Sequence, residues 1–156
     1  MTAPLHPLAL DPAGLPEENR TGYPEPYRAL VAGRFRRRLG DALGLTRFGV
    51  NLTRLEPGSA SAQRHWHSRE DELVYVLEGE LTLVTDAGEQ LLTSGMCAAF
   101  KAVVPDGHHL VNRSDRQAVL LEIGNRDPDD EAAYPDIDLR YTKGGTYVRK
   151  SSGEPW

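Results

Sequence analysis

Apolar and polar positions alternate along the middle of the chain, which is the pattern of strands with one buried face. Between residues 47 and 53 the apolar members are Phe48, Val50 and Leu52, separated by polar residues and glycine. About eight short strands bounded by turn residues indicate an all-β sandwich or barrel. After the first, the expected strands are 62–67, 72–78, 80–85, 89–92, 96–100, 108–112 and 117–124.

Two segments outside the strand-rich domain, which we place at residues 34–125, lack this alternation. Residues 1–33 are rich in proline, which removes a backbone donor and does not fit a central strand. We expect an extended arm with one short helical turn near residues 26–32. Residues 126–156 are acidic at first and irregular throughout. We expect each segment to pack on the barrel or on a partner subunit.

Composition and charge narrow the function classes. The net charge is −5, which argues against nucleic acid as the main partner. The basic residues Arg34 and Arg36 to Arg38 are interpreted as a solvated strand edge or ion pairs, with a phosphate-binding patch as the alternative. No apolar run approaches the roughly 20 residues of a membrane-spanning helix. The single cysteine, Cys97, indicates a reducing, cytoplasmic location, and we interpret it as a small core residue.

Histidine is concentrated in the strand-rich domain. Besides His6, the chain has His65, His67, His108 and His109. Two residues at positions i and i+2 of a strand point to the same side, so His65 and His67 are expected to act together. Glu72 begins an apolar run, where a carboxylate is costly unless it is paired or binds a metal. Three imidazoles and one carboxylate suit a first-row divalent metal that keeps open coordination positions.

The spacing of these residues resembles a known family. Gly58, His65, His67, Glu72 and Gly79 resemble the first motif of the cupins, Gly-x5-His-x-His-x(3,4)-Glu-x6-Gly. The departure is one extra residue between Gly58 and His65.

The second cupin motif, Gly-x5-Pro-x-Gly-x2-His-x3-Asn, is matched more loosely. Gly95 begins it, but Lys101 and Val103 replace the expected proline and glycine. His108 and Asn112 keep the final spacing, so the resemblance makes His108 the fourth ligand. His109 is the alternative, because a slip of one residue exchanges which side chain points inward.

The resemblance implies an all-β cupin double-stranded β-helix, or jelly-roll barrel, with an extended N-terminal arm and an irregular C-terminal tail. It implies one divalent transition metal per chain (iron, manganese, nickel or zinc) and a small-molecule ligand in the barrel. Strand parity directs Gln63, Val74 and Asn112 toward the site, and Phe100 is expected to cap it.

Two functions remain open at this stage. The favoured one is a metal-dependent enzyme of the oxygenase, isomerase or decarboxylase type, and the alternative is a non-catalytic protein that binds or senses a sugar or metabolite. No general base apart from the ligands can be identified. Trp66, Leu73 and Tyr75 have outward parity, which predicts a homodimer formed through that sheet face.

Overall fold

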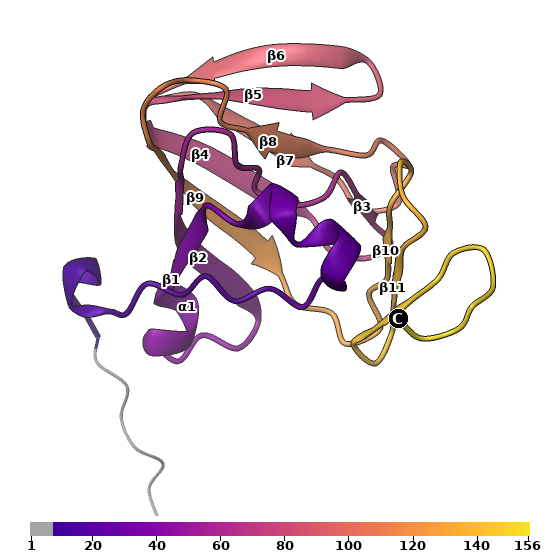
Figure 1. Ribbon diagram of the computed structural model, residues 1–156. Helices are drawn as coiled ribbons and strands as arrows, with labels where there is room; N and C mark the ends of the chain where they lie inside the picture. Colours follow the sequence, from indigo (N-terminus) through magenta and orange to yellow (C-terminus); the bar gives the residue numbers. More distant parts are fainter. Residues whose placement is uncertain (1–7) are drawn as a thin grey trace, which may run out of the picture.

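The fold is built almost entirely from antiparallel strands (Figure 1). The computed structural model describes residues 8–156, so His6, Pro4 and Pro7 lie outside the described residues. The strands form one sheet of five strands, one of four and one of three. The all-β barrel expected from the sequence is therefore confirmed.

The five-stranded sheet carries most of the barrel wall. Its order is β1-β2-β9-β4-β7, so strands that are distant in sequence lie side by side. The turn between β4 and β5 requires Gly79, whose φ of +77° favours glycine, and an added Cβ would lie 3.0 Å from the Gln117 carbonyl oxygen. The strands are β1 (Arg34–Arg38), β2 (Phe48–Leu55), β9 (Ala118–Asn125), β4 (Glu72–Glu78) and β7 (Cys97–Phe100).

The three-stranded sheet has the order β6-β5-β8, and the main core lies between it and the five-stranded sheet. Its strands are β5 (Glu80–Thr85), β6 (Gly88–Thr93) and β8 (His109–Val111). Alternation along each strand directs one face inward, which buries apolar side chains from both sheets. The buried members are Leu55, Val74, Val76, Leu81, Leu83, Leu92, Leu110, Ala118 and Leu120.

The C-terminal segment is more regular than the sequence pattern predicted. It contributes three short strands to the four-stranded sheet β12-β11-β10-β3. The strands are β3 (Trp66–His67), β10 (Ala132–Ala133), β11 (Arg140–Thr142) and β12 (Thr146–Val148). The expected strand 62–67 is reduced to its last two residues, because β3 pairs only with β10.

The described part of the N-terminal segment packs on the same chain. A second core joins it to the C-terminal segment through Tyr23, Val31, Ala132, Tyr134 and Leu139. In the part of the chain that the structure describes, helix is confined to the 3-10 turns η1 (Pro12–Gly14), η2 (Glu25–Tyr27) and η3 (Ala29–Val31) and to α1 (Leu39–Ala42). Within residues 8–156, none of these helices has the length and apolar character needed to cross a membrane.

Candidate metal centre and its pocket

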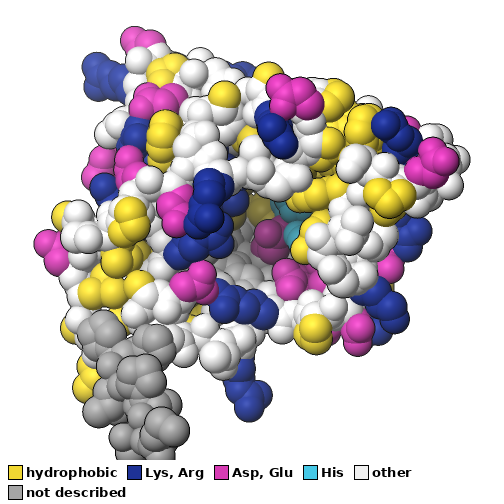
Figure 2. Space-filling model, turned by 60° about the horizontal axis from the view of Figure 1, so that its bottom comes forward, with side chains coloured by type: hydrophobic (Ala, Val, Ile, Leu, Met, Phe, Trp, Pro, Cys, Tyr) yellow, Lys and Arg dark blue, Asp and Glu magenta, His cyan; other side chains and the backbone are white. Residues whose placement is uncertain are grey.

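A cavity of about 440 Å³ opens on the face of the molecule shown in Figure 2. Histidine is visible inside this hollow, with acidic side chains beside it and Lys or Arg side chains at one side. His65, Glu72 and His108 are among the residues that line the cavity. The candidate metal-binding residues therefore lie in a space that a small molecule can enter.

Backbone pairing brings the two histidine motifs together. The His65 amide donates to the His108 carbonyl oxygen at 3.2 Å, and the His108 amide donates to the His65 carbonyl oxygen at 2.8 Å. His67 follows on β3, two residues after His65. Glu72 begins β4, where it lies opposite Phe100 of β7 and Gly124 of β9.

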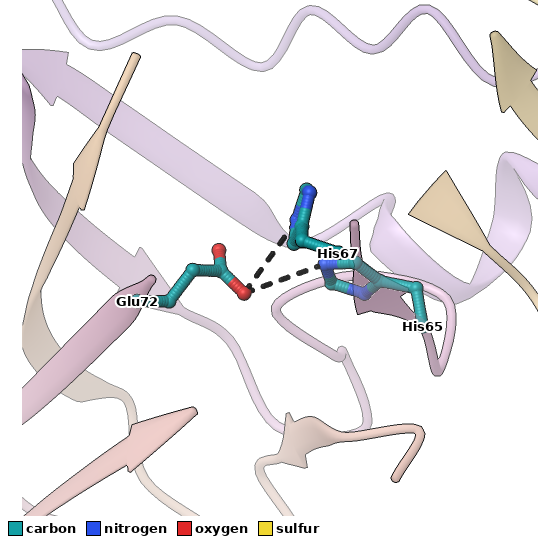
Figure 3. Close-up of side chains that lie close together, drawn as sticks. All are labelled: His65, His67 and Glu72. Carbon is teal, nitrogen blue, oxygen red and sulfur yellow. Dashed lines mark ion pairs between the residues drawn. The ribbon is translucent and has the colours of Figure 1, made fainter. Parts of the chain in front are cut away.

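Three imidazoles surround one carboxylate oxygen, Oε2 of Glu72. The Nε2 atoms of His65 and His67 lie 3.7 and 3.6 Å from it, and Nε2 of His108 lies 2.7 Å from it. Figure 3 shows how His65 and His67 converge on Glu72. Ligand atoms of these three residues lie within 4.8 Å of one another, a spacing that could hold a metal ion.

Hydrogen bonds at the far side of each ring set the direction of the lone pairs. Nδ1 of His65 contacts the Gln63 carbonyl oxygen at 2.8 Å, and Nδ1 of His67 contacts Oδ2 of Asp130 at 2.6 Å. Nδ1 of His108 faces the Asp106 carbonyl oxygen at 3.4 Å. The oxygens behind His65 and His67 are acceptors, so Nδ1 of these two rings carries the proton and Nε2 presents a lone pair. Nε2 of His108 shares a proton with Oε2 of Glu72 at 2.7 Å, and a bound cation would take the place of that proton.

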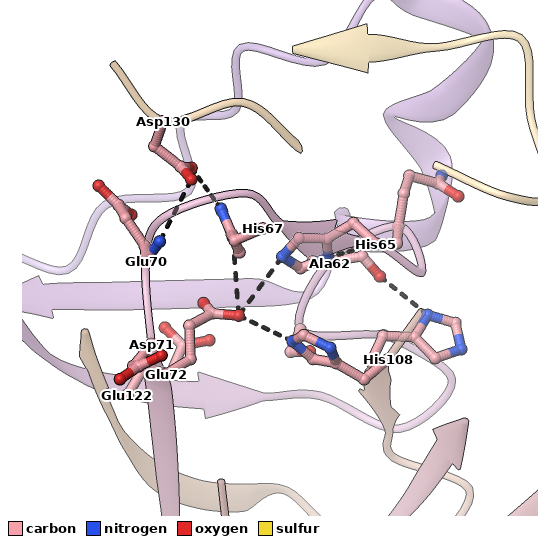
Figure 4. A network of polar contacts seen from close by, with 12 residues as sticks. Ala62, His65, His67, Glu70, Asp71, Glu72, His108, Glu122 and Asp130 are labelled. Carbon is pink, nitrogen blue, oxygen red and sulfur yellow. Dashed lines mark hydrogen bonds and ion pairs between the residues drawn. The ribbon is translucent and has the colours of Figure 1, made fainter. Parts of the chain in front are cut away.

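The centre thus directs three imidazole nitrogens and a carboxylate at one place (Figure 4). Apart from the proton that His108 and Glu72 share, this set offers only acceptors, and a divalent cation is the partner that satisfies it. The residues present therefore fit a metal ion.

The protonation states of His65 and Glu72 at neutral pH favour the binding of a cation. Burial lowers the pKa of His65 to about 4, so its ring is neutral. Burial alone would raise the pKa of Glu72, but the hydrogen bond with His108 and the nearby imidazoles hold that pKa well below its ordinary value. Glu72 is consequently anionic.

The structure also places the other residues predicted for the site. Val74 and Phe100 line the cavity, and the Phe100 ring stacks on His108 with centroids 3.6 Å apart. His109 points elsewhere, since its Nδ1 contacts the Ala62 carbonyl oxygen at 2.9 Å. Asn112 is fully buried, and its amide donates to the carbonyl oxygens of Leu55 and Arg116.

Gln63 faces the N-terminal segment. Its side-chain amide donates to the Tyr27 carbonyl oxygen at 2.9 Å, and it is not among the residues that line the cavity. Alternation from His65 does not extend to Gln63, because regular strand begins only at Trp66. Its backbone carbonyl, through the bond to His65, is the group that reaches the centre.

Sequence reasoning missed two acidic residues of the site, Asp130 and Glu70. Asp130 lies in the acidic C-terminal segment and is buried against His67. Glu70 lines the cavity between the two carboxylates Asp130 and Glu72. Arg34 and Arg36, which the sequence suggested as a solvated strand edge or ion pairs, with a phosphate-binding patch as the alternative, line the same cavity.

The comparisons agree with the fold. The cupin domain family model matches residues 51–124. A crystal structure of a sugar phosphate isomerase from a cupin superfamily, from Silicibacter pomeroyi, is 44% identical, with 95% of this chain and 96% of that chain covered and a TM-score of 0.88. This barrel, with its cluster of histidines and a glutamate, is a β-barrel of the cupin type. The chain belongs to the cupin superfamily.

More distant structures agree as well. A putative sugar phosphate isomerase from Acidithiobacillus ferrooxidans is 32% identical over 78% of this chain and 80% of that chain, with a TM-score of 0.71. A polyketide cyclase from Streptomyces resistomycificus is 19% identical over 76% of this chain and 79% of that chain, with a TM-score of 0.63, and shows the fold alone. No curated protein matches the chain significantly.

Proposed function

We propose that the protein is a metal-dependent isomerase that acts on a small, sugar-like substrate in the cavity. The observation that carries this proposal is the convergence of His65, His67, Glu72 and His108, a set composed almost entirely of acceptors, at an open, polar pocket. The 44% identity with the sugar phosphate isomerase from Silicibacter pomeroyi supports the choice of reaction and substrate class.

One divalent transition metal per chain (iron, manganese, nickel or zinc) is the proposed cofactor. The residues that would hold it are His65, His67, Glu72 and His108. A divalent cation at this place supplies Lewis-acid polarisation of a carbonyl or hydroxyl oxygen on the substrate. The set contains no thiolate, which distinguishes it from closed structural zinc sites of the cysteine-rich kind.

Isomerisation of a sugar moves a proton between neighbouring carbon atoms, so the site needs a group that transfers protons. Glu70 is our candidate, because it lines the cavity beside the centre. Its Oε1 accepts a hydrogen bond from the Asp127 amide at 2.9 Å, which fixes the carboxyl group in place. Glu72 belongs to the proposed metal centre and Glu122 pairs with Arg36, so neither carboxylate is free to transfer the proton.

The first test concerns the metal. Untagged protein should contain about one equivalent of a divalent metal, measured by elemental analysis. His65→Ala, His67→Ala and His108→Ala should each lose tightly bound metal, because each removes one lone pair from the centre. His109→Ala is the matched control and should retain the metal. If the first three variants keep a full equivalent, the centre is assigned to the wrong residues.

The second test concerns turnover. Isomerisation of sugar phosphates in D₂O, followed by NMR, should show deuterium at the carbon that exchanges its proton. Glu70→Gln should retain metal and abolish deuterium incorporation. The alternative function, a non-catalytic sugar or metabolite-binding protein, predicts metal and ligand binding with no deuterium incorporation in the wild type.

We also propose that the protein is a homodimer. The outer face of β4 exposes Leu73 and Tyr75, at 38% and 39% of their surface. Across the strands, Tyr75 lies opposite Cys97 and Leu121. Trp66 does not belong to this face, because it lies on β3 in the four-stranded sheet. The cytoplasmic location expected from the single cysteine stays a prediction.

A further inference from the structure

A row of arginines points into the barrel from β1. Arg34, Arg36 and Arg38 occupy alternate positions and therefore share one face of the strand, and all three line the cavity. Arg37 faces the other way, where its Nη1 lies 3.3 Å from Oε1 of Glu17. Charged side chains that point into a barrel are costly unless they are compensated, so each of the three needs an explanation.

Two of the three arginines have carboxylate partners. Arg36 donates to both oxygens of Glu122, at 2.7 and 2.9 Å. Arg38 donates to Oε2 of Glu18 at 3.1 Å, at the more exposed end of the row. These pairs account for the charge of Arg36 and Arg38.

Arg34 is different. Only 6% of its surface is exposed, and its Nη1 donates to the Ser61 carbonyl oxygen at 2.7 Å. Within residues 8–156 it forms no ion pair, and its Nε and Nη2 have no hydrogen-bond acceptor. Nη2 of Arg36 also approaches the Ser61 carbonyl oxygen, at 3.4 Å. Two guanidinium groups thus converge on one carbonyl oxygen, and one carboxylate, that of Glu122, neutralises only one of them.

This local charge is not removed by loss of a proton. Burial and the charge of Arg36 lower the pKa of Arg34 to about 10, so its guanidinium is still protonated at neutral pH. The cavity wall therefore holds a fixed, buried positive charge with unused N–H donors, in the same cavity as His65, Glu72 and His108. Planar guanidinium donors match the oxygens of a phosphate or carboxylate group.

We propose that Arg34, assisted by Arg36, binds an anionic group of the substrate, a phosphate ester or a carboxylate, while the sugar end of the same molecule lies at the histidine and glutamate centre. This assignment rests on the proposed function, since it places the anionic end of the substrate relative to that centre. Figure 2 agrees with this orientation, because basic side chains gather at one side of the hollow and the histidines at the other.

The test compares three probes by titration calorimetry with the protein as purified: glucose 6-phosphate, gluconate and glucose. The wild type should bind one of the two anions at least about tenfold more tightly than glucose, and the tighter anion identifies phosphate or carboxylate as the preferred group. Arg34→Met should weaken binding of that anion by about 10- to 100-fold and leave glucose binding unchanged. Arg34→Lys keeps the charge but loses the paired N–H donors of the guanidinium group. Its affinity for the anion should therefore lie between those of the wild type and Arg34→Met.

Arg37→Met is the matched control on the opposite face of β1 and should bind all three probes as the wild type does. A second measurement separates binding from folding. Removing a buried charge without a carboxylate partner should leave the melting temperature of Arg34→Met unchanged or higher, whereas a merely structural arginine would lower it on removal. The proposal is overturned if Arg34→Met binds the anion as the wild type does, or if the wild type does not prefer either anion over glucose.

Metal content distinguishes this proposal from the proposed function. Arg34→Met should keep the metal of the wild type, because Arg34 forms no hydrogen bond or ion pair with the four proposed ligands. If the wild type contains no metal, and the Arg34→Met substitution still weakens anion binding, the metal-dependent function is overturned and the anion subsite is supported.

Discussion

At the scale of single residues, Asp130 links the candidate metal centre to the protein around it. Its Oδ2 accepts from His67, while Oδ1 accepts from the backbone amides of Arg69 and Glu70 at 2.7 and 3.2 Å. The carboxylate is buried, so these bonds hold it in one orientation. A carboxylate behind a ligating histidine fixes the ring and makes it a stronger ligand.

We expect Asp130→Asn to weaken metal binding by about 10- to 100-fold, because the amide replaces the anionic acceptor of the His67 proton. Competition with a chelator measures the affinity. Asp129→Asn removes the same charge from an exposed neighbour and should have little effect. Equal affinities for Asp130→Asn and the wild type would show that Asp130 does not hold His67 as a ligand.

Some residues of the candidate site could be predicted from the sequence, and others could not. His65, His67 and Glu72 were found because their spacing follows a motif. Asp130 was not, because it lies 63 residues after His67 and nothing in the acidic run distinguishes it from Asp127 or Asp129. Cys97 was predicted as a core residue, and this was wrong: it is exposed, because it faces outward beside Tyr75.

At the scale of elements, one polar group ties three strands together. Arg36 of β1 and Thr53 of β2 both donate to Glu122 of β9, with Thr53 at 2.7 Å from Oε2. Burial would raise the pKa of Glu122, but the charge and hydrogen bonds of Arg36 outweigh it and bring the pKa below its ordinary value of 4.5. Stability from this pair is therefore complete above about pH 4.5 and is lost as the pH falls through the lowered pKa.

Glu122→Gln should reduce the free energy of unfolding at pH 7 by about 2 kcal/mol. This loss is smaller than for a fully buried ion pair, because the side chains of Arg36 and Glu122 are both partly open to the cavity. The difference from the wild type should shrink as the pH falls below about 4.5, where Glu122 itself becomes protonated. Urea unfolding between pH 7 and pH 3 measures this. Glu89→Gln, which breaks the exposed pair with Arg113, is the control, and an equal loss in both variants would contradict the prediction.

The strands themselves were largely predictable. Residues 72–78 and 80–85 form β4 and β5 with the expected bounds, since alternation and the turn at Gly79 define both ends. Strands β10 to β12 were not predicted, because two or three residues are too few to show a period. Their position depends on pairing with β3 and on the second core, which are long-range contacts.

At the scale of the whole molecule, the exposed apolar face around Leu73 and Tyr75 is the feature that the single chain leaves uncovered. We expect light scattering to give twice the monomer mass at micromolar concentration. Tyr75→Asp should give the monomer mass, because it places a charge within an apolar contact. Leu91→Asp, at a residue 52% exposed on β6, is the control and should remain dimeric. A monomeric wild type would contradict the homodimer.

The pairing of β3 with β10 also bears on when the centre can form during synthesis. Residues from His65 to His108 leave the ribosome before Asp130, and chains begin to fold from their N-terminal part while they are made. Until β10 arrives, His67 lacks both its strand partner and the carboxylate that orients its ring. The barrel strands can thus assemble first, and tight binding of the proposed metal would be a late step of biogenesis. In this order the proposed metal site stays incomplete until most of the pocket around it has formed.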